Sequence, residues 1–324
     1  MATLKDLSKR TGVSVTTISR VLNQDETMLV SRETKRAIFD AAFQLGYVPP
    51  RRRKRQPQQH TLIGVADWRI LVSGAPNITL PAMRYFAQVE YPAKSVEFIQ
   101  IGRDLSTPAD GIIAVGDFSP GEVQGLRRAS PYLVLVNSSQ KDLSCDQVQV
   151  DLDSALEQAL DYLAGQKGYR TIGYIGGIHE EDGYTIGSRR MKRMASLLLD
   201  QGLYAPALVQ TGDFSPEAGY AMARELLEGS PLPQALVIGS DMLAVGVLRA
   251  LEEQQIAIPR DMELVVYRDI QTTQLPKGGY AVIQAYPDLL WQKAVQMLME
   301  QMGGRSEAVR TIISPRLLLD GERE

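Results

Sequence analysis

Short apolar runs that alternate with amphipathic helical patterns constrain the fold of this chain more than any other feature. The runs are rich in Val, Ile, Leu and Gly and span residues 62–66, 111–115, 132–136, 171–177, 235–239 and 263–267. Helical patterns lie between them, as at 154–166 and 217–229. Strands that alternate with helices are typical of parallel sheets covered on both faces. The sequence therefore predicts an α/β body with doubly wound parallel sheets.

The side chains that follow the predicted strands have the chemistry of a binding site. Ligands of doubly wound sheets bind at the carboxyl ends of the strands. Carboxylates, an arginine, a hydroxyl and flat rings stand at those ends, namely Asp67, Trp68, Arg189, Asp213, Phe214, Ser240, Asp241 and Asp269. Such groups bind sugars, because charged groups bond pairs of hydroxyls and rings cover the C–H face. Ordinary loops and helix caps would also place polar residues there, so both interpretations stay open at this point.

The charge of the chain is divided unevenly. Residues 1–60 hold twelve Lys or Arg and five Asp or Glu, a net charge of +7. The other residues hold 23 basic and 33 acidic side chains, a net charge of −10. A basic module on an acidic body is typical of a protein whose first part binds an anion such as nucleic acid.

The first 48 residues have the pattern of three short helices. Thr3 and Asp6 fit a capping box that starts the first helix, and Gly12 ends it. Ser14 can cap the second helix, whose inward residues are Ile18, Val21 and Leu22. The third helix starts at Ser31, and its expected buried residues are Ala37, Ile38, Ala41, Ala42 and Leu45. Two helices joined by a tight glycine turn predict a helix-turn-helix.

The outward face of the second helix has the composition of a DNA-reading surface. Val15, Thr16 and Arg20 can reach base edges, because small residues let a helix sit deep in the major groove and arginine pairs with guanine. Hydroxyls that can bond phosphates, and so position the protein, are those of Thr17, Ser31 and Thr34. A plain three-helix bundle with ordinary caps is the alternative.

Residues 3–23, TLKDLSKRTGVSVTTISRVLN, and 30–49, VSRETKRAIFDAAFQLGYVP, are similar to the N-terminal signature of the LacI/GalR family of bacterial repressors. The resemblance runs nearly unbroken through Pro49. It implies sequence-specific binding to double-stranded operator DNA. The DNA-binding residues that it implies are Thr3, Ser14, Val15, Thr16, Thr17, Ser19, Arg20, Asn23, Ser31, Thr34, Tyr47, Arg51, Arg53 and Lys54.

The segment 49–61 is a basic linker that contains five consecutive cations, Arg51–Arg55. Such a run attracts phosphate in a salt-dependent way. The family places a hinge helix here, which folds on DNA and inserts a leucine into the minor groove. This chain has Gln56 followed by Pro57 at that point. An apolar wedge is therefore not expected, and arginines that track a narrow groove are the alternative.

Three segments of the body, 109–116, 167–177 and 235–269, are similar to further blocks of the same family. The resemblance implies a periplasmic-binding-protein-like body of two doubly wound Rossmann-like subdomains, with a small effector between them. By position, Arg189 would clamp polar groups of the effector, Phe214 would stack on it, and Asp269 would bind sugar hydroxyls. The same resemblance adds Ser240 and Tyr286, and the strand-end residues Asp67 and Trp68 complete the predicted effector site. Ser240 and Arg268 depart from the Asn and Asp found at those positions in many members.

The Ser-Asp pair at 240–241, the GVLRA segment at 246–250 and the Thr pair after YRDI resemble the evolved β-galactosidase operon repressor subgroup. That resemblance implies a galactoside or galactose effector. The alternatives are a repressor of this family with another ligand, including a corepressor such as a phosphoprotein or a purine, and a sugar-binding protein that does not act on DNA. Asp67 and Asp269 argue against a strongly anionic ligand.

These features predict a helix-turn-helix domain at 1–48, a basic hinge at 49–61, and an effector-binding and dimerisation domain at 62–324. The resemblance divides this domain into an N-subdomain of about 62–158 plus 285–311 and a C-subdomain of about 159–284 plus 312–324. A homodimer is expected, because a two-fold protein matches a pseudo-palindromic operator. No leucine heptad follows the last strand, so a tetramer is not expected.

Other classes of function lack support in the sequence. His60 and His179 are the only histidines and neither has a second ligand at metal spacing, so we expect no metal or cofactor. No catalytic constellation such as G-x-S-x-G is present, which argues against an enzyme. Cys145 is the only cysteine, and neither a long apolar span nor a secretory signal is found. A cytoplasmic protein without membrane contact is therefore expected.

Overall fold

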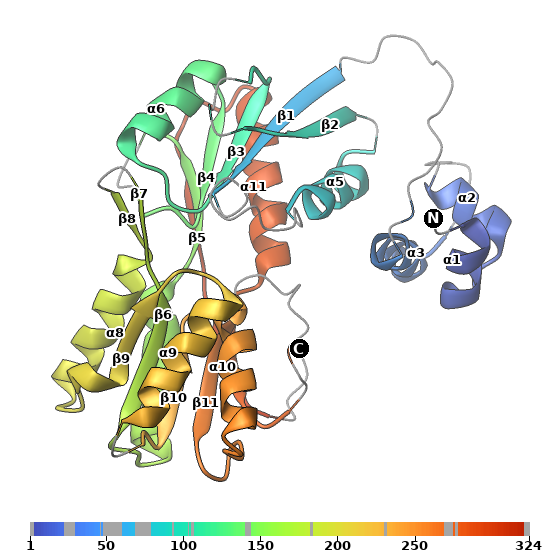
Figure 1. Ribbon diagram of the computed structural model, residues 1–324. Helices are drawn as coiled ribbons and strands as arrows, with labels where there is room; N and C mark the ends of the chain where they lie inside the picture. The colour runs from blue at the N-terminus through green and yellow to red at the C-terminus, as the bar shows by residue number, and fades with distance from the viewer. Residues whose placement is uncertain are drawn as a thin grey trace.

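The computed structural model describes residues 3–22, 30–45, 47, 60–68, 79–92, 94–102, 104, 107–139, 144–181, 184–229, 232–268, 275 and 278–320. Figure 1 shows a small helical head and an elongated body of two lobes. The helices are α1 Leu4–Thr11, α2 Val15–Leu22, α3 Arg32–Gln44, α5 Thr79–Glu90, α6 Pro120–Ala129, α7 Leu152–Leu160, α8 Ser188–Asp200, α9 Pro216–Glu228, α10 Asp241–Glu253 and α11 Pro287–Met302. The strands are β1 His60–Asp67, β2 Ser95–Gln100, β3 Gly111–Val115, β4 Leu133–Val136, β5 Asp146–Val150, β6 Ile172–Gly177, β7 His179–Glu181, β8 Tyr184–Ile186, β9 Val209–Gly212, β10 Ala235–Ile238, β11 Glu263–Arg268, β12 Ala281–Gln284, β13 Arg310–Ile313 and β14 Arg316–Leu318.

The head consists of α1, α2 and α3 around a small core. Leu7, Ile18 and Ile38, one from each helix, are fully buried there. Gly12 has φ +69° and follows α1 directly, so the turn into α2 uses a backbone conformation that suits glycine. The predicted three-helix order is confirmed. Ala37 is an exception, because α3 turns it toward solvent and not into the core.

The N-lobe is built on a parallel sheet with the strand order β13-β5-β4-β3-β1-β2. Alternate residues of its central strand enter different cores. Ile113 and Val115 pack toward α5 and α11, whereas Ile112 and Ala114 pack toward α6. Both faces of the sheet are therefore covered, which explains why β3 is apolar at every position.

The C-lobe repeats this layout with the strand order β14-β12-β11-β10-β6-β9. Its pairs are parallel except β12 with β14, which is antiparallel. Helices α9 and α10 cover one face, whereas α7 and α8 pack on the other. Figure 1 shows the two lobes stacked end to end, with the β7–β8 hairpin rising from the C-lobe toward the N-lobe.

The six strands predicted from apolar runs are confirmed as β1, β3, β4, β6, β10 and β11. The other strands, which are short or polar, carry no such pattern, because an edge strand such as β9 or β13 exposes part of its length and loses the continuous apolar signal. The predicted helix over 154–166 is α7 followed by a π-helical turn, Asp161–Gln166.

The chain passes between the lobes at three described segments, from β5 to α7, from β12 to α11 and from β13 to β14. The expected subdomain boundaries fall near these segments. However, the boundary at 158–159 lies inside α7, which packs against α8 and β14 of the C-lobe. The boundary at 311–312 lies inside β13. We therefore propose three boundaries between the lobes. The first is at Asp151, the second directly precedes α11, and the third lies between β13 and β14.

Candidate effector cleft and nucleic-acid interface

The second helix of the head exposes the residues expected to read bases. Val15 is 38% exposed, and Thr16 and Arg20 also face solvent, whereas Thr17 and Ser19 are half-buried. Ile18 and Val21 occupy the opposite face and anchor α2 to the head core. The helix therefore presents one small polar face with a single guanidinium, which suits the major groove.

Hydroxyl groups cap the helices of the head where a phosphate could approach. Ser14 Oγ accepts from the Thr17 amide at 3.1 Å, before α2, and Ser31 Oγ accepts from the Thr34 amide at 3.1 Å, before α3. Thr3 forms a capping box with Asp6, whose pKa is lowered by the hydrogen bonds that Thr3 donates to its carboxylate. Exposed helix N-termini of this kind favour anions.

The remaining DNA-binding candidates differ in what the structure says of them. Tyr47 packs against the head core, and its amide donates to the Ala42 carbonyl at 2.9 Å. Asn23, the hinge residues Arg51, Arg53 and Lys54, and the effector candidate Asp269 lie outside the described residues. Their roles stay predictions.

The carboxyl end of β1 places Asp67 and Trp68 where the lobes meet. Asp67 is fully buried, and Thr79 Oγ1 donates to its Oδ2 at 2.5 Å. Trp68 is 6% exposed and forms edge-to-face contacts with two C-lobe rings, His179 at 5.5 Å and Phe214 at 6.1 Å between ring centres. The lobes therefore meet at an aromatic cluster of Trp68, His179 and Phe214, and this junction is called the cleft.

Phe214 follows β9, and its ring packs directly against the backbone of two glycines. An added Cβ on Gly177 would come within 2.3 Å of its ring, and one on Gly187 would come within 2.8 Å. Only residues without side chains allow this approach, so the two glycines determine where the ring rests. The structure thus brings Trp68 and Phe214 together, as expected of two effector-binding residues, although no bound ligand tests that role.

Two neighbouring arginines at the start of α8 have side chains that point in different directions. Arg189 is about half exposed and lies 3.9 Å from Asp153 in the first turn of α7. Arg190 is partly buried, donates to the Gly239 carbonyl, and stacks over the Tyr267 ring with 4.1 Å to its centre. Arg190 therefore lies at the ends of β10 and β11. The family resemblance points to Arg189, and the adjacent Arg190 is the sequence feature that offers an alternative.

Other side chains close the C-lobe side of the cleft. Ser240 is buried and caps α10, its Oγ accepting from the Leu243 amide at 3.3 Å, which is the helix-cap role weighed as an alternative. The adjacent Asp241 is fully buried at the same helix start. Tyr286 has φ 49° and precedes α11 at a lobe crossing. Gln284, at the end of β12, is 3% exposed, and its Oε1 accepts no hydrogen bond from the described residues.

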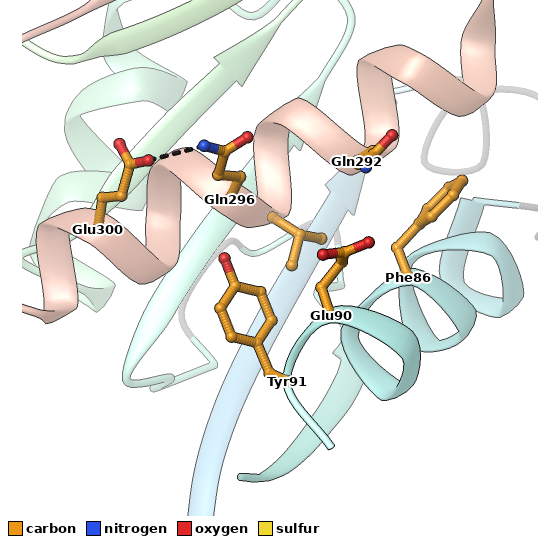
Figure 2. A pocket seen from close by; sticks show the side chains of 7 residues that line it. Phe86, Glu90, Tyr91, Gln292, Gln296 and Glu300 are labelled. Atoms are coloured by element: carbon orange, nitrogen blue, oxygen red, sulfur yellow. Dashed lines mark hydrogen bonds between the residues drawn. The ribbon is translucent and has the colours of Figure 1, made fainter. Parts of the chain in front are cut away.

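A groove of about 250 Å³ lies elsewhere, between α5 and α11 of the N-lobe. Figure 2 shows Glu90, Tyr91 and Phe86 on one side and Gln292, Gln296 and Glu300 on the other. Burial and the nearby carboxylates of Glu300 and Glu90 raise the pKa of Tyr91. None of the predicted effector residues lines this groove, so it is separate from the cleft.

The described part of the chain holds no group of three or more His, Cys, Asp or Glu side chains placed to bind a metal ion. Among its helices, none combines the length and apolar character needed to cross a bilayer.

Comparison with known proteins covers both parts of the chain. Residues 3–50 match the family model described as bacterial regulatory proteins, lacI family, and residues 160–319 match a periplasmic binding protein-like domain. A regulator named HTH-type transcriptional regulator GalR, from Streptococcus thermophilus, is 30% identical, with 98% of this chain and 94% of the relative covered.

Two solved structures share the fold over nearly the whole length. The transcriptional regulator CelR in complex with cellobiose has a TM-score of 0.65 and 23% identity, covering 98% of this chain and 99% of that one. The Lac repressor dimer bound to operator and the anti-inducer ONPF has a TM-score of 0.66 and 20% identity, with 98% and 97% covered. At these identities the two structures establish the architecture.

Proposed function

Because the chain belongs to the LacI family of bacterial regulatory proteins, we propose that it represses a sugar-utilisation operon and leaves its operator when a small sugar binds between the lobes. It is a DNA-binding transcriptional regulator and not an enzyme. The observation that carries the proposal is the meeting of strand ends from both lobes at Trp68, His179 and Phe214. A ligand there touches both lobes at once, so its binding can change how they are arranged.

The groups around the cleft support a neutral, hydroxyl-rich effector. Carboxylates at Asp67 and Asp241 can accept from sugar hydroxyls, and Arg190 can donate to them. The Trp68 and Phe214 rings can cover the C–H face of a pyranose. In place of Arg189, we propose Arg190 as the arginine that holds the effector. Gln284, whose buried amide oxygen accepts no hydrogen bond from described residues, joins this set.

A galactoside is the proposed effector class, on the strength of the resemblance to GalR and of the Ser240–Asp241 pair. The related fold of CelR holds cellobiose, which supports a disaccharide as readily as a single sugar. We further propose a cytoplasmic homodimer on a pseudo-palindromic site, with one head per half-site. By linkage, operator DNA must weaken sugar binding by the same factor as sugar weakens DNA binding.

Fluorescence anisotropy tests this proposal. A labelled palindrome, selected from random DNA by the purified chain, is titrated with protein and then with galactose, lactose, melibiose and cellobiose. Tight binding that one sugar reverses would support an inducible repressor and identify the effector. Binding that no sugar changes would contradict the sugar proposal. Equal affinity for random DNA would contradict sequence-specific repression.

A further inference from the structure

His179 lies at the junction of the lobes against Trp68, and the proposed function gives its imidazole no task in effector binding. It begins β7, directly after β6 and Ile178, and belongs to the short β7–β8 hairpin. The hairpin crosses toward the N-lobe, where Ile186, at its other end, is buried in the same apolar cluster as Trp68. His179 is therefore carried by a C-lobe element that is seated on the N-lobe.

The imidazole of His179 makes two different contacts. Its Nδ1 lies 3.2 Å from Asp213 Oδ1, a carboxylate in the loop after β9. Its ring meets Trp68 edge to face, at an interplanar angle of 67°. About a quarter of the His179 side chain is exposed, against 73% for Asp213. The carboxylate thus holds the outer edge of the ring, while the ring itself faces inward.

Trp68 is enclosed by elements that come from both lobes. Gly116 approaches it so closely that an added Cβ would lie 2.9 Å from the Trp68 Cβ. Phe214 contacts its ring at an interplanar angle of 77°, and Ile186 completes the apolar enclosure. The N-lobe therefore fixes the base of the side chain, and the C-lobe rings determine the position of the indole.

We propose that His179 is a positioning residue of the effector cleft: held by Asp213, it fixes the Trp68 indole against Phe214 and thereby sets how strongly an effector is bound. The effector part of this inference rests on the proposed function, whereas the positioning part does not. An edge-to-face pair favours one relative orientation of two rings. Loss of the imidazole would free the indole, and a sugar that stacks on it would meet a less organised surface.

The first measurement needs no sugar. Acrylamide quenching of tryptophan emission in the full chain reports the shielding of Trp68 and Trp291, and Trp68→Phe identifies the share that comes from Trp291. His179→Ala removes both contacts, His179→Phe keeps the ring, and His179→Gln keeps only a group that can bond Asp213. Glu180→Ala is the matched control, because Glu180 is the exposed neighbour on the same strand.

His179→Ala should increase the quenching of Trp68 about three- to tenfold, which is the fold-change that corresponds to the free energy of one edge-to-face pair. His179→Phe should restore most of the shielding, and His179→Gln should restore little. Equal quenching in His179→Ala and Glu180→Ala would overturn the proposal, as would rescue by Gln but not by Phe. If His179→Ala fails to fold, the Phe and Gln variants alone decide.

A second measurement adds the effector. With galactose, lactose, melibiose and cellobiose as probes, the sugar concentration for half-release of operator DNA should rise several-fold in His179→Ala relative to Glu180→Ala, and His179→Phe should reverse this. An unchanged concentration would overturn the effector part of the proposal. If no sugar releases DNA from the unmodified chain, the proposed function fails, while the quenching result still decides whether His179 positions Trp68.

Discussion

The head and the cleft present their functional side chains in opposite ways. In the head, the residues proposed to read DNA lie within two turns of α2 and face solvent. In the cleft, Asp67, Trp68 and Asp241 come from the ends of distant strands and are buried. The head is therefore a ready-made surface, whereas the cleft exists only through the placement of two lobes. Substitutions in the head should therefore affect only the head, whereas substitutions in one lobe should also affect the site between the lobes.

The largest effect is expected from Arg305→Met, which tests whether the body depends on buried charge pairs. The Arg305 guanidinium bonds both carboxylate oxygens of Asp146, one of them at 3.1 Å, and Asp146 is 1% exposed. Removal of the cation leaves the buried carboxylate without its ion-pair partner, although the Val309 amide still donates to it at 2.8 Å, and loss of one partner of a buried pair costs about 3–5 kcal/mol. Urea unfolding of the full chain followed by tryptophan emission should show this loss. Operator affinity of the folded protein, measured by anisotropy without urea, should change little.

The same pair predicts a pH dependence. Burial works against the charged form of Asp146, but the hydrogen bonds from Arg305, together with others, keep the pKa of its carboxyl below the ordinary value. The stabilisation by this pair is therefore complete above about pH 4 and is lost as the pH falls through the lowered pKa.

The matched control for Arg305→Met is Arg260→Met, which breaks the exposed pair with Asp261 and should leave the unfolding curve unchanged. An equal loss in both variants would contradict the importance of burial.

The second effect concerns the cleft itself. Arg190→Met should raise the sugar concentration for half-release of DNA by about 10- to 100-fold, as expected for loss of charged hydrogen bonds. Arg189→Met is the matched control, since the neighbouring Arg189 is about half exposed and lies beside Asp153. The measurement is the anisotropy titration with the sugar found for the unmodified chain. A larger effect of Arg189→Met would restore the assignment made from the sequence.

This pair of arginines shows where sequence reasoning stops. The six central strands and the head helices could be predicted, because burial on both faces and periodic apolar residues leave a local signal. The choice between Arg189 and Arg190 depends on the rotational setting of α8, which starts after Gly187 at φ 84°. The contact of His179 with Trp68 joins segments far apart in the sequence. The adjacent arginines mark this alternative but do not decide it, and the contact of His179 with Trp68 has no local signal, so the cleft could be predicted only as a set of strand-end residues.

The third effect concerns operator binding by the head. Arg20→Ala should weaken operator binding by about 1–3 kcal/mol and relax the preference at one base pair, because an arginine reads guanine with two hydrogen bonds. Thr34→Ala, at a position predicted to contact phosphate, should instead weaken binding evenly across operator sequences. Competition with single-base operator variants separates the two outcomes. The head would not be a local reading surface if both substitutions changed affinity without changing preference.

The smallest effects are expected from replacing one glycine in the head and one in the body. Gly12 follows α1 at φ +69°, so Gly12→Ala forces a side chain into the left-handed region and should destabilise the head by about 1 kcal/mol. Gly165 lies in the π-helical turn of the C-lobe, and an added Cβ would meet no atom within 4 Å. Gly165→Ala should therefore stabilise the body by about 0.5–1 kcal/mol, because alanine restricts the unfolded chain. Thermal unfolding followed by circular dichroism measures both. Opposite signs would show that the turn between α1 and α2 needs glycine for its conformation, and a gain of stability from Gly12→Ala would remove the conformational reason for that residue.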